Sequence, residues 1–329
     1  MLDPKAAVTN RGEVPGIRAV HSPLTAAMLA PLDEDCWLVQ FADQLTDAEC
    51  RELSKLLESR PTVKLRAYGD VPNLEFLKHF PGLRRFQVDE AETLEDISGL
   101  GYLSRDVESL GVGARLSRRL SLRVLRRFSG LRRLYLEGPV KDIDVIAELK
   151  SLQHLTLRSI TLPDLEILTQ LQELLSLEIK LGGTQNLSHL PSIGRLQYLE
   201  LWMVRGLSDL TPISSVLTLE YLFLQALSRV DHLPPLDRLT NLRGVCLETM
   251  KGIHDLSPLM RAPDLEELWV IAMSHLQPDD FTCLVGHPTL KYASVGLGST
   301  GKNDAVRRVL GLHEPPLAFK LRWQSAATA

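Results

Sequence analysis

The pattern Leu-x-x-Leu-x-Leu recurs along most of this chain and restricts its possible folds more than any other feature. Clear copies begin at Leu131, Leu152, Leu174, Leu196, Leu219, Leu242 and Leu265. Weaker copies begin at Thr62, Leu83, Val107 and Leu290. The eleven copies follow one another with a mean period of about 23 residues. Such a period predicts a solenoid, in which every repeat packs only on its neighbours.

Each copy predicts a short strand followed by a return segment. The alternation Leu-x-Leu directs leucines to one side of the strand and the intervening residues to the other. Thr211-Pro212 and Ser257-Pro258 predict short helical turns in the returns, with the hydroxyl residue as the cap and proline in the first turn. Leucine accounts for 65 of the 329 residues. Because one repeat cannot bury its leucines alone, stability must come from stacking.

In period and register these copies resemble the leucine-rich repeat, and the resemblance covers roughly residues 60–300. It implies an α/β solenoid, a horseshoe with a parallel β-sheet on the concave face and short helices or 3₁₀ turns on the convex face. Many members place asparagine three residues after the last strand leucine, but this chain has no asparagine in that column. The period and the Leu-Thr-Pro-Ile and Leu-Ser-Pro-Leu returns resemble the short bacterial or phosphatase-regulator type of repeat.

The two ends of the chain differ from the repeats. Residues 1–60 are predicted to form an N-terminal cap, with a strand at 37–41 and a helix that ends near Glu58. Thr46 and Glu49 have the spacing of a capping box for this helix. Residues 61–300 form the predicted solenoid, and residues 301–329 a C-terminal cap with a helix at 304–312 and a frayed tail at 324–329.

Composition and motifs argue against several classes of protein. The net charge of −4 gives no basic excess for nucleic-acid binding. No secretory signal begins the chain, and no apolar stretch reaches the roughly 20 residues of a membrane helix. The four cysteines and nine histidines show no disulfide, zinc or catalytic spacing. We therefore expect a monomeric, cytoplasmic protein that is not an enzyme and has no catalytic residues, cofactor or metal.

The outward positions of the strands carry most of the tyrosine and tryptophan. Seven of these ten residues lie there, but only one of eight phenylalanines does. A general preference of aromatic residues for strands would enrich phenylalanine equally. Exposed aromatic side chains on a rigid sheet are typical of binding hot spots, so the face predicts a protein partner. The predicted contact residues are Tyr135, Arg158, Lys180, Tyr198, Glu200, Trp202, Tyr221, Phe223, Glu248, Trp269 and Tyr292.

Charge is distributed unevenly along the same outward positions. The first five repeats carry an excess of three basic residues there, and the last six an excess of three acidic residues. This distribution could orient a partner of opposite polarity, or it could reflect ordinary solubilising charge. Eight arginines and no acid occur between Arg115 and Arg133. They form either a patch for an acidic partner or the solvated side of an amphipathic segment.

Two alternatives to a general interaction module remain open. One is a narrower version, an immunity or inhibitor protein that neutralises a toxin or effector enzyme. The other is a nucleotide-binding switch that uses the glycine loop at 296–302, which is similar to a phosphate-binding loop. Asn303 stands where that loop needs a hydroxyl residue. Residues 181–184 repeat the glycine turn in register, which favours a structural turn of the solenoid.

Overall fold

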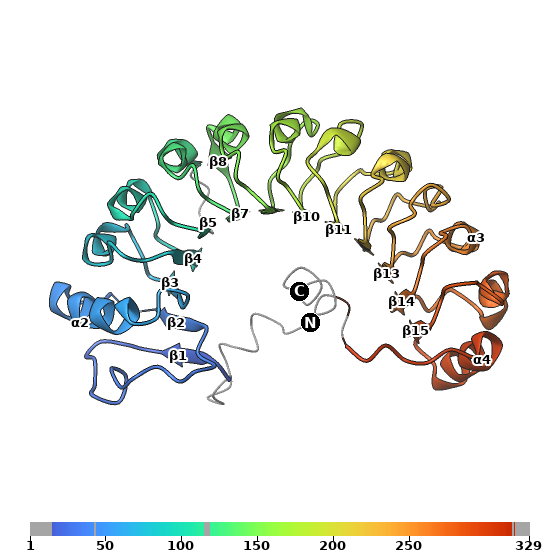
Figure 1. Cartoon of the computed structure of the whole chain (residues 1–329), viewed down its shortest axis with the longest axis horizontal. Helices are drawn as coiled ribbons and strands as arrows, with labels where there is room; N and C mark the ends of the chain where they lie inside the picture. Colours follow the sequence, from blue (N-terminus) through green and yellow to red (C-terminus); the bar gives the residue numbers. More distant parts are fainter. Residues whose placement is uncertain (1–14, 43, 115–118, 318, 320–329) are drawn as a thin grey trace. The chain divides into compact units, whose positions relative to one another are not determined.

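The computed structural model describes residues 15–42, 44–114, 119–317 and 319, in two compact units that span residues 1–149 and 150–329. In each unit, parallel strands lie along one side and short helical turns along the other (Figure 1). Parts of two sequence-based predictions, the arginine run at Arg115 and Arg118 and the tail at 324–329, lie outside the described residues. Among the described helices, none is long and apolar enough to span a bilayer.

The first unit contains six strands that pair in chain order, all of them parallel: β1 (Ile17–Ala19), β2 (Leu38–Phe41), β3 (Lys64–Gly69), β4 (Arg85–Ala91), β5 (Ser109–Ala114) and β7 (Arg133–Glu137). Its helical segments are α2 (Asp47–Glu58), η1 (Glu75–His79), η2 (Ser98–Tyr102), η3 (Leu122–Arg127) and η4 (Ile143–Glu148). The short strands β6 (Leu120–Ser121) and β8 (Val140–Lys141) pair separately on the returns.

The second unit contains seven parallel strands, again in chain order: β9 (His154–Arg158), β10 (Ser176–Lys180), β11 (Tyr198–Trp202), β12 (Tyr221–Gln225), β13 (Gly244–Glu248), β14 (Glu267–Ile271) and β15 (Tyr292–Val295). Its helical segments are η5 (Glu166–Gln170), η6 (Leu190–Ser192), η7 (Thr211–Ser215), α3 (Ser257–Met260), η8 (Pro278–Leu284) and α4 (Thr300–Leu310). The strands from β3 to β15, apart from β6 and β8, coincide with the eleven predicted copies. Their register is confirmed.

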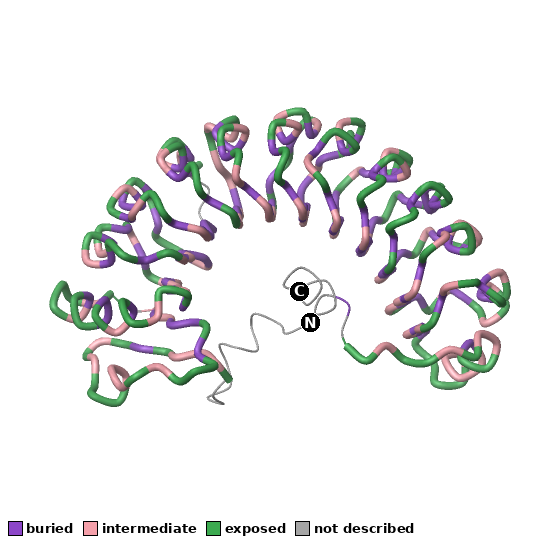
Figure 2. Tube along the Cα trace, in the orientation of Figure 1, coloured by how far each residue is buried: buried purple, intermediate pink, exposed green. Residues whose placement is uncertain are grey.

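The hydrophobic core of each unit lies between the strands and the returns. On β12 and β13 the inward residues Leu222, Leu224, Val245 and Leu247 are all fully buried. The parallel register pairs Leu222 with Val245 and Leu224 with Leu247. Buried backbone recurs along the strands of both units, while exposed backbone concentrates on the returns (Figure 2). Each repeat therefore contributes the same aliphatic columns to a core that only stacking completes.

A residue in the left-handed conformation follows most of the strands of the second unit. Ser159, Leu181 and Met203 have φ angles of 57°, 57° and 48°, and Ala226, Thr249 and Ala272 adopt the same conformation. The amide of Leu181 donates to the carbonyl of Trp202 at 2.8 Å, one repeat further on. Equivalent bonds to the next repeat are donated by the amides of Ser159, Met203, Ala226 and Thr249. The turns are thus satisfied by backbone bonds between repeats. The column in which many leucine-rich repeats carry asparagine holds buried apolar residues here, such as Val204 and Met250.

Several returns begin with a side chain that caps the first turn, but the capping residue is not the predicted hydroxyl residue. Helical turns do start at Thr211 and Ser257, but neither hydroxyl caps its turn. The carboxylates of Asp209 and Asp255 accept those two amides instead, each at 2.8 Å. Four other returns have the same arrangement, with acceptors Asn73, Asp96, Asp164 and Asn186. An Asx side chain bonds the backbone two residues on because its short arm reaches that amide.

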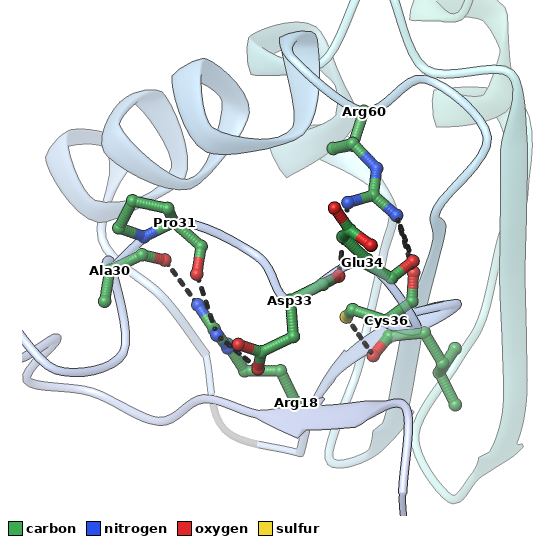
Figure 3. Close-up of polar contacts among 8 residues, drawn as sticks. Arg18, Ala30, Pro31, Asp33, Glu34, Cys36 and Arg60 are labelled. Atoms are coloured by element: carbon green, nitrogen blue, oxygen red, sulfur yellow. Dashed lines mark hydrogen bonds and ion pairs between the residues drawn. The ribbon is translucent and has the colours of Figure 1, made fainter.

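The N-terminal region contains the predicted strand and helix, and the capping box is confirmed. Thr46 Oγ1 accepts from the Glu49 amide, and the Glu49 carboxylate accepts from the Thr46 amide at 2.8 Å. An unpredicted strand, β1, pairs outside β2. Arg18 donates to the Ala30 and Pro31 carbonyls, and Arg60 to those of Asp33, Glu34 and Cys36 (Figure 3). These bonds hold the connection between β1 and β2 in place.

At the other end, helix α4 begins at Thr300, four residues before the predicted start, and ends at Leu310. Gly311 adopts a left-handed φ of 64° as its cap. The boundaries of the two caps relative to the solenoid stay predictions.

Replacing Glu49 with glutamine is expected to loosen the N-terminal region at neutral pH and to have less effect in acid. Bonds from the Thr46 and Leu24 amides, the Thr46 hydroxyl and the Ser22 hydroxyl lower the pKa of Glu49 from 4.5 to about 2. A depressed pKa contributes stability that is present above pH 4.5 and is lost as the pH falls towards 2. Hydrogen exchange of residues 22–27 and 45–58 should therefore accelerate in Glu49→Gln at pH 7. Equal acceleration by Glu52→Gln, whose side chain is exposed, would contradict this role.

Candidate functional site

The outward side chains of β9–β15, which we call the strand face, form straight rows across the second unit because the strands pair in register. One row contains His154, Ser176, Tyr198, Tyr221, Gly244, Glu267 and Tyr292. The next contains Thr156, Glu178, Glu200, Phe223, Cys246, Trp269 and Ser294. A third contains Arg158, Lys180, Trp202, Gln225, Glu248 and Ile271. Nine of the eleven predicted contact residues lie in β9–β14 and share these rows.

The remaining two predicted residues lie outside β9–β14. Tyr135 is on β7 of the first unit, where its hydroxyl donates to the Glu137 carboxylate. Tyr292 is on β15, the last strand of the second unit, and forms a bridge with His313 beyond helix α4. The structure therefore concentrates the predicted site on the second unit.

The expectation that the aromatic anchors are exposed is wrong for three of them. Tyr198, Tyr221 and Phe223 are only 2%, 5% and 4% exposed although they point outward from the strands. Phe319, which follows helix α4, packs on them and is itself buried. Its ring centroid lies 5.7 Å from that of Tyr221 and 5.9 Å from that of Phe223, both edge to face. Trp202 and Trp269 are half-buried.

These residues form what we call the aromatic cluster: Tyr198, Tyr221, Phe223, Cys246 and Phe319, with Trp269 and Ile271 packed against it. A notch at Gly244 makes room for Phe319. A β-carbon on Gly244 would lie 2.7 Å from Cδ1 of Tyr221 and 3.0 Å from Cε2 of Phe319. Every other strand from β3 to β15 in the repeat series carries a side chain at this column. A side chain at this column of β13 would therefore collide with the rings of Tyr221 and Phe319.

A buried charged group adjoins the aromatic cluster. Glu200 is 1% exposed, and its carboxylate accepts from the Tyr198 hydroxyl at 3.0 Å. Lys180 lies 3.3 Å from the same carboxylate and also pairs with Glu178. Burial lowers the pKa of Lys180, but the charges of Glu178 and Glu200 outweigh it, so the pKa is raised. Burial and then Glu200 raise the pKa of the Tyr198 hydroxyl.

The third row continues the same mixture of aromatic and polar groups. The guanidinium of Arg158 lies over the Trp202 ring, 5.2 Å from its centroid, which is the geometry of a cation–π contact. Gln225 donates to the Glu248 carboxylate at 2.8 Å. Of the predicted residues, Arg158, Lys180, Glu200 and Glu248 therefore have intramolecular contacts. Their contribution to a binding site would come from a preorganised surface rather than from loose side chains.

Two other features of the sequence have structural explanations. Lys302, in the glycine loop, donates to the carbonyls of Ser274 and Leu276 at 3.0 and 3.2 Å, and Asn303 accepts the Leu297 amide. The loop thereby joins helix α4 to the preceding repeat. In the arginine run, Arg123 pairs with Asp142, and Arg126 with Asp144 and Glu148. The acids missing from the run itself come from the following repeat.

One group of potential metal ligands was missed because its members come from neighbouring repeats. Asp164, Glu166 and His189 each place one ligand atom within 4.8 Å of the others. Asp164 already accepts the Glu166 amide in the Asx turn described above. Clusters of partly exposed acidic groups are common without a metal, so geometry alone gives this group no function.

Comparison with solved structures identifies the fold. An internalin of Listeria monocytogenes matches 85% of this chain and 78% of its own, with 19% identity and a TM-score of 0.54. The Toll–Spätzle complex of Drosophila matches 78% of this chain and 34% of that one, with 16% identity and a TM-score of 0.50. A leucine-rich-repeat protein of Leptospira interrogans matches 86% and 92%, with 14% identity and a TM-score of 0.34. No protein-family model and no curated protein matches. The chain is a leucine-rich-repeat solenoid, as its sequence predicts.

Proposed function

We propose that this protein is a non-enzymatic interaction module that binds another protein on the strand face of β9–β14. One observation carries the proposal: the strand face accepts an aromatic side chain, Phe319, that comes from outside the repeats. Outward aromatic side chains backed by a rigid sheet lose little conformational entropy on binding, and such residues dominate interface energetics. Of the structural neighbours, Toll is in complex with another protein, Spätzle.

Charged side chains next to the aromatic residues support recognition of a polar partner surface. Arg158 stacks on Trp202, and Lys180 and Glu200 form a buried pair. Groups already held in place cost little to order when a partner binds. The narrower possibility of an immunity or inhibitor protein is a case of the same function with an enzyme as the partner. The loop at 296–302 is used structurally through Lys302, which disfavours the nucleotide switch.

The proposal is tested by comparing proteins captured from native lysate by four full-length chains. The first strand-face variant is Trp202→Ala/Trp269→Ala. The second, Arg243→Glu/Lys291→Glu, reverses two exposed charges at the edge of the strand face, immediately before β13 and β15. The control, Leu217→Ala/Met260→Ala, removes exposed apolar side chains from the returns. Only variants whose melting curves match that of the wild type are compared.

We expect the wild type and the control to capture at least one protein in equal amounts. A strand-face variant should capture about tenfold less of that protein, because one hot-spot residue contributes 2 kcal/mol or more to binding. A partner lost in the control but retained by both strand-face variants would place binding on the returns and refute the proposal.

A further inference from the structure

The segment that follows helix α4 returns to the strand face instead of leaving it. The amide of Ala293 on β15 donates to the His313 carbonyl at 2.9 Å, and Tyr292 and His313 form a parallel bridge. Glu314 pairs with Arg307 of α4 at 2.9 Å. Six residues after His313, Phe319 packs against side chains of β12 and β13. Six residues can span at most about 20 Å, which exceeds the three strand spacings of about 4.8 Å between β15 and β12.

The place that Phe319 occupies is lined mainly by aromatic side chains. Tyr221 and Phe223 meet it edge to face, Cys246 and Gly244 leave the space beneath it, and Trp269 packs against the cluster. Among the described residues, the indole nitrogen of Trp269 and Oε1 of Gln225 are buried without a hydrogen-bond partner. They supply a donor and an acceptor for a segment that binds beside the notch.

Charge near the notch selects for basic residues beside that aromatic ring. Glu267 neighbours Gly244 in the same row, and Glu248 lies on the same strand as Gly244. Lys320 and Arg322 follow Phe319 in the sequence. The strand face of the last six repeats has an acidic excess. An aromatic residue followed by basic residues is thus the complementary sequence.

We infer that the notch at Gly244 binds a segment of a partner protein in which an aromatic residue is followed by basic residues, and that the chain's own Phe319 competes for the same place. The inference rests on the proposed function and names the chemistry of its partner. A tethered segment has an effective concentration in the millimolar range. A tail that binds the notch with its own Kd of about 0.1 mM therefore weakens any competing partner segment by about tenfold, and a partner of high enough affinity or concentration displaces it.

The probe for this competition is a fluorescein-labelled peptide of residues 312–329, whose binding to full-length chains is followed by anisotropy. Phe319→Ala should bind the probe about tenfold more tightly than the wild type, because the tethered competitor is gone. The matched control is Leu317→Ala, an exposed residue in the same segment, which should bind the probe as the wild type does. Adding Gly244→Val to Phe319→Ala fills the notch and should abolish binding.

Two altered probes test the chemistry of the ligand against the Phe319→Ala chain. A probe with Phe319→Ala should not bind, and one with Lys320→Glu and Arg322→Glu should bind at least tenfold more weakly. Equal affinity of wild type and Phe319→Ala for the original probe would overturn the competition. Unchanged binding after Gly244→Val would show that the notch is not the binding site and would overturn the inference.

Sedimentation of the wild type tests the remaining occupant. A dimer that Phe319→Ala dissolves would make a second copy of this chain the ligand and overturn the inference. Failure of these peptide experiments leaves the lysate comparison to decide the proposed function, since a partner can bind the strand face elsewhere.

Discussion

Leu247→Ala is expected to lower the free energy of unfolding by about 3 kcal/mol, which is a large part of the stability of a typical domain. Leu247 is fully buried, and its strand neighbours in register are Leu224 and Val270. Leu247 stands in a column of aliphatic side chains with a strand on each side, so no flexible loop can move in to fill the space that it leaves. The cavity therefore stays open, and the loss includes a cavity contribution as well as the transfer contribution.

The matched control is Arg243→Ala, immediately before the same strand. Its side chain is exposed, while its backbone bonds Glu220, Glu266 and Glu267 and is not altered by the substitution. In urea denaturation followed by circular dichroism, the free energy of unfolding of this variant should differ from that of the wild type by less than about 0.5 kcal/mol. Similar losses for the two variants would contradict the placement of Leu247 in the core.

Lys180→Met is expected to destabilise the protein by about 3 kcal/mol because it leaves the carboxylate of Glu200 buried and removes the ammonium group 3.3 Å from it. The side chain of Lys180 is 12% exposed and that of Glu200 1% exposed. In the double variant Lys180→Met/Glu200→Leu the buried charge is gone as well, so most of the lost stability should return. A double variant as unstable as the single one would show that the pair does not act as a unit.

An exposed pair provides the comparison. Lys291 and Glu266 approach to 3.4 Å with side chains 59% and 35% exposed, and Lys291→Met should cost less than about 1 kcal/mol. The effect at Lys180 should also depend on pH. Its pKa is raised, so the pair stabilises the fold fully below the ordinary value of 10.5 and loses this effect as the pH rises through the raised pKa. Unfolding measured at pH 8 and pH 11 should therefore show a larger difference between wild type and variant at pH 8.

Repetition explains why so much of the fold was predictable. A pattern such as Leu219-x-x-Leu-x-Leu is short and ambiguous alone, but eleven copies in one register fix the strand positions and the inward side. Local devices were partly readable: the capping box at Thr46 and Glu49 is confirmed. The Asx turns were not recognised, although Asp209 and Asp255 precede their returns at a constant spacing.

The candidate site was predictable only as a set of outward positions. The sequence marks Tyr198, Tyr221 and Phe223 as outward but not as buried, because burial here depends on Phe319, about 100 residues further along the chain. The sequence shows that Gly244 is the one glycine at that position of the eleven repeats. Its meaning appears only when an aromatic ring is seen to fill the space.

The sequence by itself determined the repeat, its register and the side of each strand that faces the core, because these depend on contacts between residues a constant distance apart. The tertiary structure decided what lies on the outward face. A segment beyond the repeats has no periodic relation to them, so where it docks depends on shape and charge complementarity in three dimensions. The notch at Gly244, with Tyr221 and Phe223 beside it, supplies that complementarity to Phe319.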